Sequence, residues 1–160
     1  MKKINQAVIL AGGLGTRLRP FTNTNPKPMF KFFGKPFLEY LILQLKSEGI
    51  VEVVLLLGYL SEIIVDYFKD GKDFGIRIKY SISDLEDLTG ERLKKSNKLL
   101  NDEFILLYCD NYWPLNLKKM TELFYSTNSD AMITVYNNRD NYSKNNLLID
   151  NNNVIVEYDK

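Results

Sequence analysis

Residues 7–20 of this 160-residue chain read AVILAGGLGTRLRP, and this stretch decides how the fold begins. An apolar run ends abruptly at three closely spaced glycines, Gly12, Gly13 and Gly15, which predicts a strand over residues 3–10 and then a sharp turn. Glycine lets the backbone turn tightly and bring its N–H groups close to an anion. One interpretation of the loop is a phosphate site, and the other is a purely structural turn.

Two known phosphate-loop patterns do not match this loop. Leu18 stands where the dinucleotide-binding pattern needs its third glycine, and no Gly-Lys-Ser/Thr follows at the Walker spacing. Local charge nevertheless favours an anion site, because Arg17 and Arg19 lie in the loop and a proline flanks Lys27 on each side. The prolines restrict the backbone around this lysine, so its ammonium can point in fewer directions than that of an ordinary surface lysine. Amides, guanidinium and ammonium together suit a polyphosphate.

Strand and helix patterns alternate along most of the chain outward from this loop. Apolar runs predict strands at residues 3–10, 50–57, 76–82, 104–109 and 131–136. Helical spacing predicts helices at residues 36–48, 61–68 and 88–100, and one that begins at Asn116, with Ser61 capping the second. Three asparagines at 151–153 predict a hairpin turn between strands at 147–149 and 154–156. This order predicts an α/β sandwich with a mainly parallel sheet and an antiparallel excursion near the end.

Two of these elements carry further expectations. The strand at 104–109 is apolar along most of its length, so we expect it to be buried. The helix from Asn116 places four apolar side chains on one face, which we expect to point inward: Leu117, Met120, Leu123 and Phe124.

Composition excludes several kinds of chemistry. Histidine is absent and Cys109 is the only cysteine, which removes histidine-dependent triads, His-ligated zinc and internal disulfides. Lys+Arg 21 against Asp+Glu 20 leaves a net charge of +1, so a basic nucleic-acid-binding face is not expected. No apolar run approaches the ~20 residues of a membrane helix, and no signal peptide is visible. We therefore expect a cytoplasmic protein that binds neither nucleic acid nor membrane.

A longer pattern continues from the loop. The run from Ala7 to Tyr40 contains Gly-x-Gly-Thr-Arg at residues 13–17, Pro-Lys-Pro at 26–28 and Gly-Lys-Pro at 34–36. In this order and at about this spacing, the three motifs closely resemble the signature of the sugar-1-phosphate nucleotidyltransferases. The resemblance spans the whole chain, densely at the start and thinly toward the end. It implies a Rossmann-like three-layer sandwich, with residues 1–160 as one domain that forms the N-terminal, nucleotide-binding portion of a larger catalytic domain.

The resemblance also implies a reaction: a sugar 1-phosphate oxygen attacks the α-phosphorus of a nucleoside triphosphate and releases pyrophosphate. The attacking phosphate is already ionised at neutral pH, so the reaction needs no general base. A chain without histidine is therefore compatible with it. Hexose or heptose 1-phosphates for surface-polysaccharide precursors are the family's usual substrates. Self-association of the chain into a homo-oligomer is left open.

Roles follow from the resemblance position by position. The loop residues Ala11, Gly12, Gly13, Gly15 and Thr16 would bind the triphosphate through backbone amides. Arg17 would hold the pyrophosphate, Lys27 would stabilise charge at the α-phosphate, Asp110 would bind Mg²⁺, and Lys160 would contact the sugar phosphate.

Each of these residues also has a plainer interpretation. Arg17 and Lys27 could be solvated loop charges, Asp110 could merely cap the next segment, and Lys160 is terminal. Cys109 is expected to be a small buried apolar side chain. The neighbouring aromatic pair, Tyr112 and Trp113, could line a sugar pocket or cover the sheet edge.

Departures from the family pattern keep two other functions open. Glu91 and Arg92 stand where the family has small residues near the base and sugar, and residues 108–111 replace its usual Asn-Gly-Asp. The family's second magnesium-binding aspartate lies further downstream than Lys160. The resemblance therefore does not identify the nucleotide base or the sugar of the substrates. One alternative is a truncated or non-catalytic nucleotide-binding module, and another is an interaction domain with a structural glycine loop.

Overall fold

A computed structural model describes residues 3–114 and 116–159. It separates into two compact units, Met1–Leu123 and Phe124–Lys160. The first contains a parallel sheet with helices, and the second contains a small hairpin. Within the described residues, no helix is long and apolar enough to cross a membrane.

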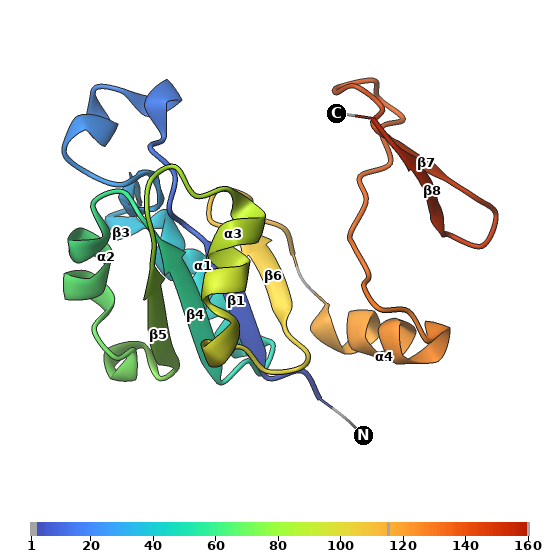
Figure 1. Ribbon diagram of the computed structural model, residues 1–160, viewed down its shortest axis with the longest axis horizontal. Coiled ribbons are helices and arrows are strands. Elements are labelled where there is room, and N and C mark those ends of the chain that lie inside the picture. Colours follow the sequence, from blue (N-terminus) through green and yellow to red (C-terminus); the bar gives the residue numbers. More distant parts are fainter. Residues whose placement is uncertain (1–2, 115, 160) are drawn as a thin grey trace. The chain divides into compact units, whose positions relative to one another are not determined.

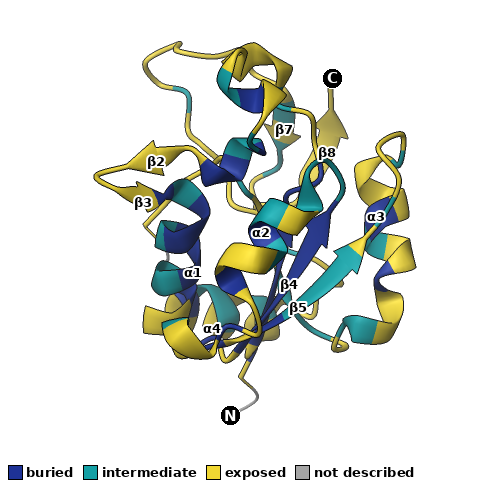
Figure 2. Cartoon of the chain, turned by 90° about the vertical axis from the view of Figure 1, so that its left-hand side faces the viewer, coloured by how far each residue is buried: buried dark blue, intermediate teal, exposed yellow. Residues whose placement is uncertain are grey.

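The first unit is built on a four-stranded sheet with the order β5-β4-β1-β6 (Figure 1). These strands are β1 (Gln6–Leu10), β4 (Glu52–Leu57), β5 (Arg77–Ile82) and β6 (Ile105–Tyr108). All three neighbouring pairs are parallel, with Val8 opposite both Val54 and Leu106. The two central strands are buried along their whole length, as expected of parallel strands covered on both faces. Figure 2 shows this contrast between buried β4 and half-buried β5.

Helices cover both faces of this sheet. The helices α1 (Phe37–Ser47) and α2 (Ser61–Phe68) bury Leu41 and Ile64 against one face. On the other face, Leu93 of α3 (Thr89–Lys95) packs against the second apolar cluster. The α/β sandwich with a mainly parallel sheet is therefore confirmed, as three layers around a central sheet.

Helix ends follow local backbone chemistry, with one correction. The helix α1 stops at Gly49, whose φ of 90° only glycine adopts readily, while the Ile50 N–H donates to the carbonyl of Leu45 at 3.0 Å. The prediction that Ser61 caps α2 is wrong. Leu60 holds the cap position with φ 48°, and no side chain caps this end. The chain enters the helix through a left-handed residue, so Ser61 is already its first helical residue.

Two predicted elements near the middle of the chain differ in detail. The helix expected at 88–100 is divided into α3 and a 3-10 turn, Asn97–Leu99, because the Ser96 hydroxyl donates to the carbonyl of Leu93 at 2.7 Å and the helix ends there. The prediction of a fully buried strand at 104–109 is wrong. Leu106 and Tyr108 of β6 are 43% and 58% exposed, because β6 is an edge strand that pairs only with β1 among the described residues.

The helix α4 (Leu117–Thr127) begins as predicted. Asn116 accepts a hydrogen bond from the Lys119 N–H at 3.0 Å, which caps this end. Leu117 is buried in the main core, and its N–H donates to the Glu48 carboxylate at 2.8 Å. The expected inward face holds in part, because Leu117 is buried and Met120 and Phe124 are half-buried, whereas Leu123 is 54% exposed.

The second unit contains an antiparallel hairpin of β7 (Leu147–Ile149) and β8 (Ile155–Tyr158), which confirms the predicted excursion. The strand predicted at 131–136 is wrong. These residues have no regular structure, and Ile133 and Val135 are 53% and 44% exposed. A strand needs a neighbour to pair its backbone groups, and no described residue pairs with this segment.

Candidate active site

The glycine loop leaves the sheet at the carboxyl ends of β1 and β4. The Ala11 N–H donates to the carbonyl of Leu56 at 2.9 Å, and the carbonyl of Gly12 accepts from the Tyr59 N–H at 3.3 Å. Ligands of open parallel sheets bind in the crevice outside this end of the strands. The loop therefore lies where the fold places a ligand.

Four consecutive backbone N–H groups in this loop have no partner. Within the described residues, the N–H groups of Gly12, Gly13, Leu14 and Gly15 donate to no acceptor. The loop is nevertheless anchored, because the carbonyl of Gly15 accepts from the Leu18 N–H at 2.9 Å and from the Thr22 hydroxyl at 3.0 Å. Carbonyls held by the protein and N–H groups left open are the arrangement that binds anions.

The segment after the loop is a series of 3-10 turns, at Thr16–Leu18, Phe21–Asn23 and Lys27–Met29. The Tyr59 hydroxyl donates to the carbonyl of Thr22 at 2.8 Å and so holds this segment to the first turn after β4. Gly15 has φ 62°, and a Cβ there would lie 2.8 Å from the Cβ of Lys27. The structure therefore brings Lys27 against the glycine loop.

Lys27 meets Asp110 across a long interval of sequence. The Lys27 Nζ lies 2.5 Å from Asp110 Oδ2, and the two side chains are 34% and 44% exposed. Asp110 follows β6, which places it at the same end of the sheet as the loop. An ion pair this open to water contributes little to stability. Its importance is that an ammonium and a carboxylate stand together beside four unpartnered N–H groups.

The Lys27–Asp110 pair forms the polar end of a hollow of about 160 Å³. The rest of its lining is apolar and aromatic: Leu18, Phe30, Phe32, Phe37 and Cys109. Burial raises the pKa of the Cys109 thiol to about 12, so this group stays protonated at neutral pH and is no nucleophile. The expectation of a small buried side chain holds in part, because Cys109 is half-buried.

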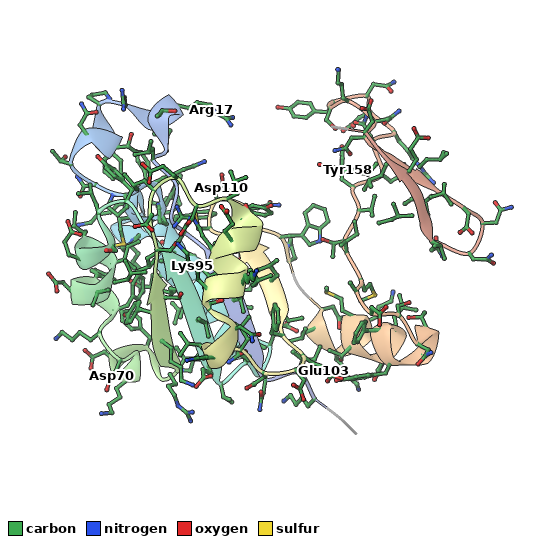
Figure 3. All side chains as sticks on the ribbon, viewed as in Figure 1. Arg17, Asp70, Lys95, Glu103, Asp110 and Tyr158 are labelled. Atoms are coloured by element: carbon green, nitrogen blue, oxygen red, sulfur yellow. The ribbon has the colours of Figure 1, made fainter. Side chains whose placement is uncertain are left out.

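The remaining predicted site residues are more scattered. Arg17 and Thr16 are exposed, and Arg17 makes no hydrogen bond or ion pair with another described residue. Figure 3 shows Arg17 and Asp110 at the same end of the first unit. Trp113 is 58% exposed and does not line the hollow, whereas Tyr112 packs edge-on against Phe37 with 6.5 Å between ring centroids. Lys160 lies outside the described residues.

The metal prediction has limited support in the side chains present. Among the described residues, no group of three or more His, Cys, Asp or Glu could hold a metal ion. Asp110 is a single, accessible carboxylate, which is a ligand of the type that Mg²⁺ prefers.

One residue at this end of the sheet was noted in the sequence only as a departure from the family pattern. Arg92 is buried, 6% exposed, and its guanidinium lies against Gly12 and Gly58. No sequence pattern indicated this burial, because an arginine in a polar helix is ordinarily solvated.

Comparison with known proteins identifies the family of the chain. Residues 6–146 match the family model described as nucleotidyl transferase. The chain is 44% identical over 115 residues to D-glycero-alpha-D-manno-heptose 1-phosphate guanylyltransferase of Campylobacter jejuni, covering 72% of this chain and 52% of that protein. It is 34% identical over 140 residues to UTP–glucose-1-phosphate uridylyltransferase of Synechocystis, covering 36% of that protein.

The fold comparison extends further along the chain. The crystal structure of HddC from Yersinia pseudotuberculosis complexed with GMP-PN is 32% identical, with a TM-score of 0.76 over 98% of this chain and 71% of that one. The chain thus spans about half, or less, of the length of the two curated relatives above. The match over residues 6–146 confirms the resemblance drawn from residues 7–40: the chain belongs to the nucleotidyl transferase family.

Proposed function

We propose that this chain is the nucleotide-binding portion of an enzyme that joins a nucleoside triphosphate to a sugar 1-phosphate, giving a nucleotide sugar and pyrophosphate. The observation that carries the proposal is the set of four unpartnered N–H groups at residues 12–15 beside Lys27 and Asp110. The relatives act in the same reaction class by their names. The product is a precursor for surface polysaccharide or related glycans.

In this proposal the loop binds the triphosphate through its open N–H groups, with Ala11 and Thr16 at its two ends. Arg17 has no partner among the described residues, so its guanidinium is available to hold the departing pyrophosphate. Lys27 lies against Gly15 and stabilises charge on the α-phosphate. The sugar phosphate supplies its own ionised oxygen, so the protein's work is alignment and charge stabilisation. Lys160 contacts the sugar phosphate.

Asp110 would hold Mg²⁺, sharing it with water and phosphate oxygens because only one carboxylate stands here. When bound, the ion supplies positive charge that offsets the negative charge of the phosphates. Lys27 pairs with Asp110, which keeps its ammonium at the carboxyl end of the sheet. The apolar wall of the adjoining hollow can receive a non-phosphate part of a substrate.

Three further statements belong to the proposal. Residues 1–160 form one portion of a single catalytic domain, as the partial coverage of the relatives suggests. The reaction takes place in the cytoplasm, since a chain with one cysteine needs no oxidising compartment. Guanosine triphosphate with a heptose 1-phosphate is the pair we favour, because the guanylyltransferase is the more similar of the two curated relatives.

The test measures pyrophosphate release from a chain that includes any downstream region, with Mg²⁺, each of the common nucleoside triphosphates in turn, and a panel of hexose and heptose 1-phosphates. Release with the guanosine and heptose pair is the expected result. Release with another pair would retain the reaction and correct the substrate. No release with any pair, from a chain that still binds a triphosphate by calorimetry, would reject the enzyme.

That last outcome would favour the second candidate, a nucleotide-binding module without turnover. One observation supports this candidate: the described residues place a single carboxylate at the site. An interaction domain with a structural glycine loop predicts that no triphosphate binds at all, and that substitution of Arg17 changes nothing.

A further inference from the structure

Arg92 uses every hydrogen-bond donor of its side chain within the first unit. A guanidinium group carries five N–H donors. Five hydrogen bonds of 2.7–3.2 Å lead from it to the carbonyls of Leu57, Asp84, Leu85 and Asp87 and to the hydroxyl of Ser83. These acceptors lie at the carboxyl ends of β4 and β5 and in the loop before α3. Arg92 therefore joins three segments at the edge of the sheet that carries the glycine loop.

All five acceptors are uncharged, so the positive charge has no counter-ion in the protein. Within residues 3–114 and 116–159, Arg92 forms no ion pair. The two nearest carboxylates in sequence, Asp84 and Asp87, pair with Lys95 instead. A buried charge without a partner is costly unless something else offsets it. An anion bound at this edge of the sheet would supply the missing negative charge.

The guanidinium also occupies space that two glycines leave open. A Cβ on Gly12 would lie 2.4 Å from Arg92 Nη1, and a Cβ on Gly58 would lie 2.7 Å from the same atom. Neither glycine has a left-handed φ, so they are needed here for space and not for backbone conformation. The guanidinium therefore packs against Gly12, the first residue of the loop whose N–H is open.

We propose that Arg92 is a positioning residue of the nucleotide site. It holds the Gly12 and Gly58 turns together so that the open N–H groups face outward, and it places a positive charge beneath them for the triphosphate. Since all five donors are engaged, it acts through shape and charge and donates no hydrogen bond to the substrate. This role rests on the proposed function of the loop.

The first experiment measures the binding of inorganic tripolyphosphate by calorimetry. Arg92→Met keeps the apolar stem and removes the charge, whereas Arg92→Lys keeps the charge. We expect about tenfold weaker binding for the methionine variant and partial recovery for the lysine variant, because the charge lies in a poorly solvated position. A folded methionine variant that binds like the wild type would overturn the role of Arg92 and leave the proposed function intact. A wild type that binds no polyphosphate or nucleotide would reject both.

If Arg92→Met does not fold, a second variant tests the proposal. Ser83 offers the one side-chain acceptor of the five, so Ser83→Ala loosens the guanidinium and leaves its charge in place. We expect severalfold weaker tripolyphosphate binding and a modest fall in the unfolding midpoint, because one buried N–H of the guanidinium loses its acceptor. Unchanged binding would count against the proposal.

The packing against Gly12 has its own test, which needs no ligand. Gly12→Ala must displace the guanidinium, whereas a Cβ on Gly13 meets nothing within 4 Å. We expect Gly12→Ala to lower the unfolding midpoint clearly more than Gly13→Ala does, and to cost less when combined with Arg92→Met. Gly58→Ala is the control, because its Cβ would also meet the backbone oxygen of Gly12 at 2.8 Å and stays costly in either background. Equal costs for Gly12→Ala with and without Arg92 would contradict the packing.

Discussion

The amino end and the carboxyl end of the parallel sheet both carry charged side chains, and they differ in how completely their polar groups are paired. At the amino end, Glu52 is buried and accepts hydrogen bonds from Gln6 at 2.8 Å, Lys79 at 3.1 Å and Arg77 at 3.1 Å. At the carboxyl end, the described residues place an exposed ion pair and a loop with four open N–H groups near a buried arginine that forms no ion pair with any of them. Complete pairing stabilises a fold, while incomplete pairing leaves polar groups that can bind a ligand.

The pKa of Glu52 reflects the complete pairing at the amino end. Burial acts to raise this pKa, but the hydrogen bonds from Gln6 and Lys79, together with the charge of Arg77, outweigh it, so the pKa lies below its ordinary value of 4.5. The folded state therefore favours the ionised carboxylate at this end of the sheet. The amino end is thus a stabilising network that needs no ligand.

The largest expected effect is at the carboxyl end. Lys27→Ala should reduce pyrophosphate release about 100-fold or more, since one donor that stabilises transition-state charge is worth about this much. The unfolding midpoint should move little, because the ion pair with Asp110 is open to water. Lys31→Ala is the matched control, since Lys31 is an exposed lysine on the nearby strand β2 (Lys31–Phe32). Equal losses of pyrophosphate release for both lysines would contradict a specific role of Lys27 at the carboxyl end.

The amino end should give the opposite result. Glu52→Ala removes one of the two acceptors of the buried Gln6 amide, whose other bond goes to the carbonyl of Leu99 at 2.9 Å, and should lower the free energy of unfolding by about 2 kcal/mol, measured by urea denaturation. Triphosphate binding should stay within about twofold of the wild type, because distant sites are usually independent. A large loss of binding would show that the two ends are coupled through the sheet.

A smaller effect is expected at Arg17. Arg17→Ala should weaken pyrophosphate and triphosphate binding by about fivefold at low salt, and less at high salt, because its charge is exposed and screened. Calorimetry at two salt concentrations measures both quantities. The exposed Arg19→Ala serves as the control, and an equal loss there would assign the effect to general loop charge.

The smallest effect concerns pH. Because the folded-state pKa of Glu52 is lowered, its contribution to stability is present above the unfolded value near 4.5 and is lost as the pH falls through the folded value. The difference in unfolding free energy between the wild type and Glu52→Gln should therefore shrink below about pH 4.5. Urea denaturation at several pH values measures it, and a difference that grows on acidification would contradict the assignment.

Much of the first half of the fold could be predicted from sequence. The strands β1 and β4 are continuous apolar runs and α1 has strong helical spacing, so each was found within a few residues. Residues 131–136 show the limit of this reasoning. Their apolar run fits a strand, but pairing depends on a neighbour that local sequence does not reveal.

The candidate site likewise has features that the sequence predicted and features that only the fold shows. Its glycine loop and Pro-Lys-Pro segment were predicted from the sequence, because backbone freedom, side-chain size and charge are properties of the residues themselves. The approach of Lys27 to Asp110, by contrast, depends on β6 lying beside β1. Burial of Arg92 depends on five acceptors contributed by three segments.

The sequence by itself determined the α/β class, the motifs that resemble the family and the place of the glycine loop. Each of these depends on local chemistry: hydrophobic periodicity, glycine at the end of a strand, and proline on both sides of a lysine. Only the tertiary structure decided which charges stand together and which polar groups stay unpaired. Those properties arise where strands distant in sequence end side by side, and there desolvation and hydrogen-bond geometry determine what each charged group can do.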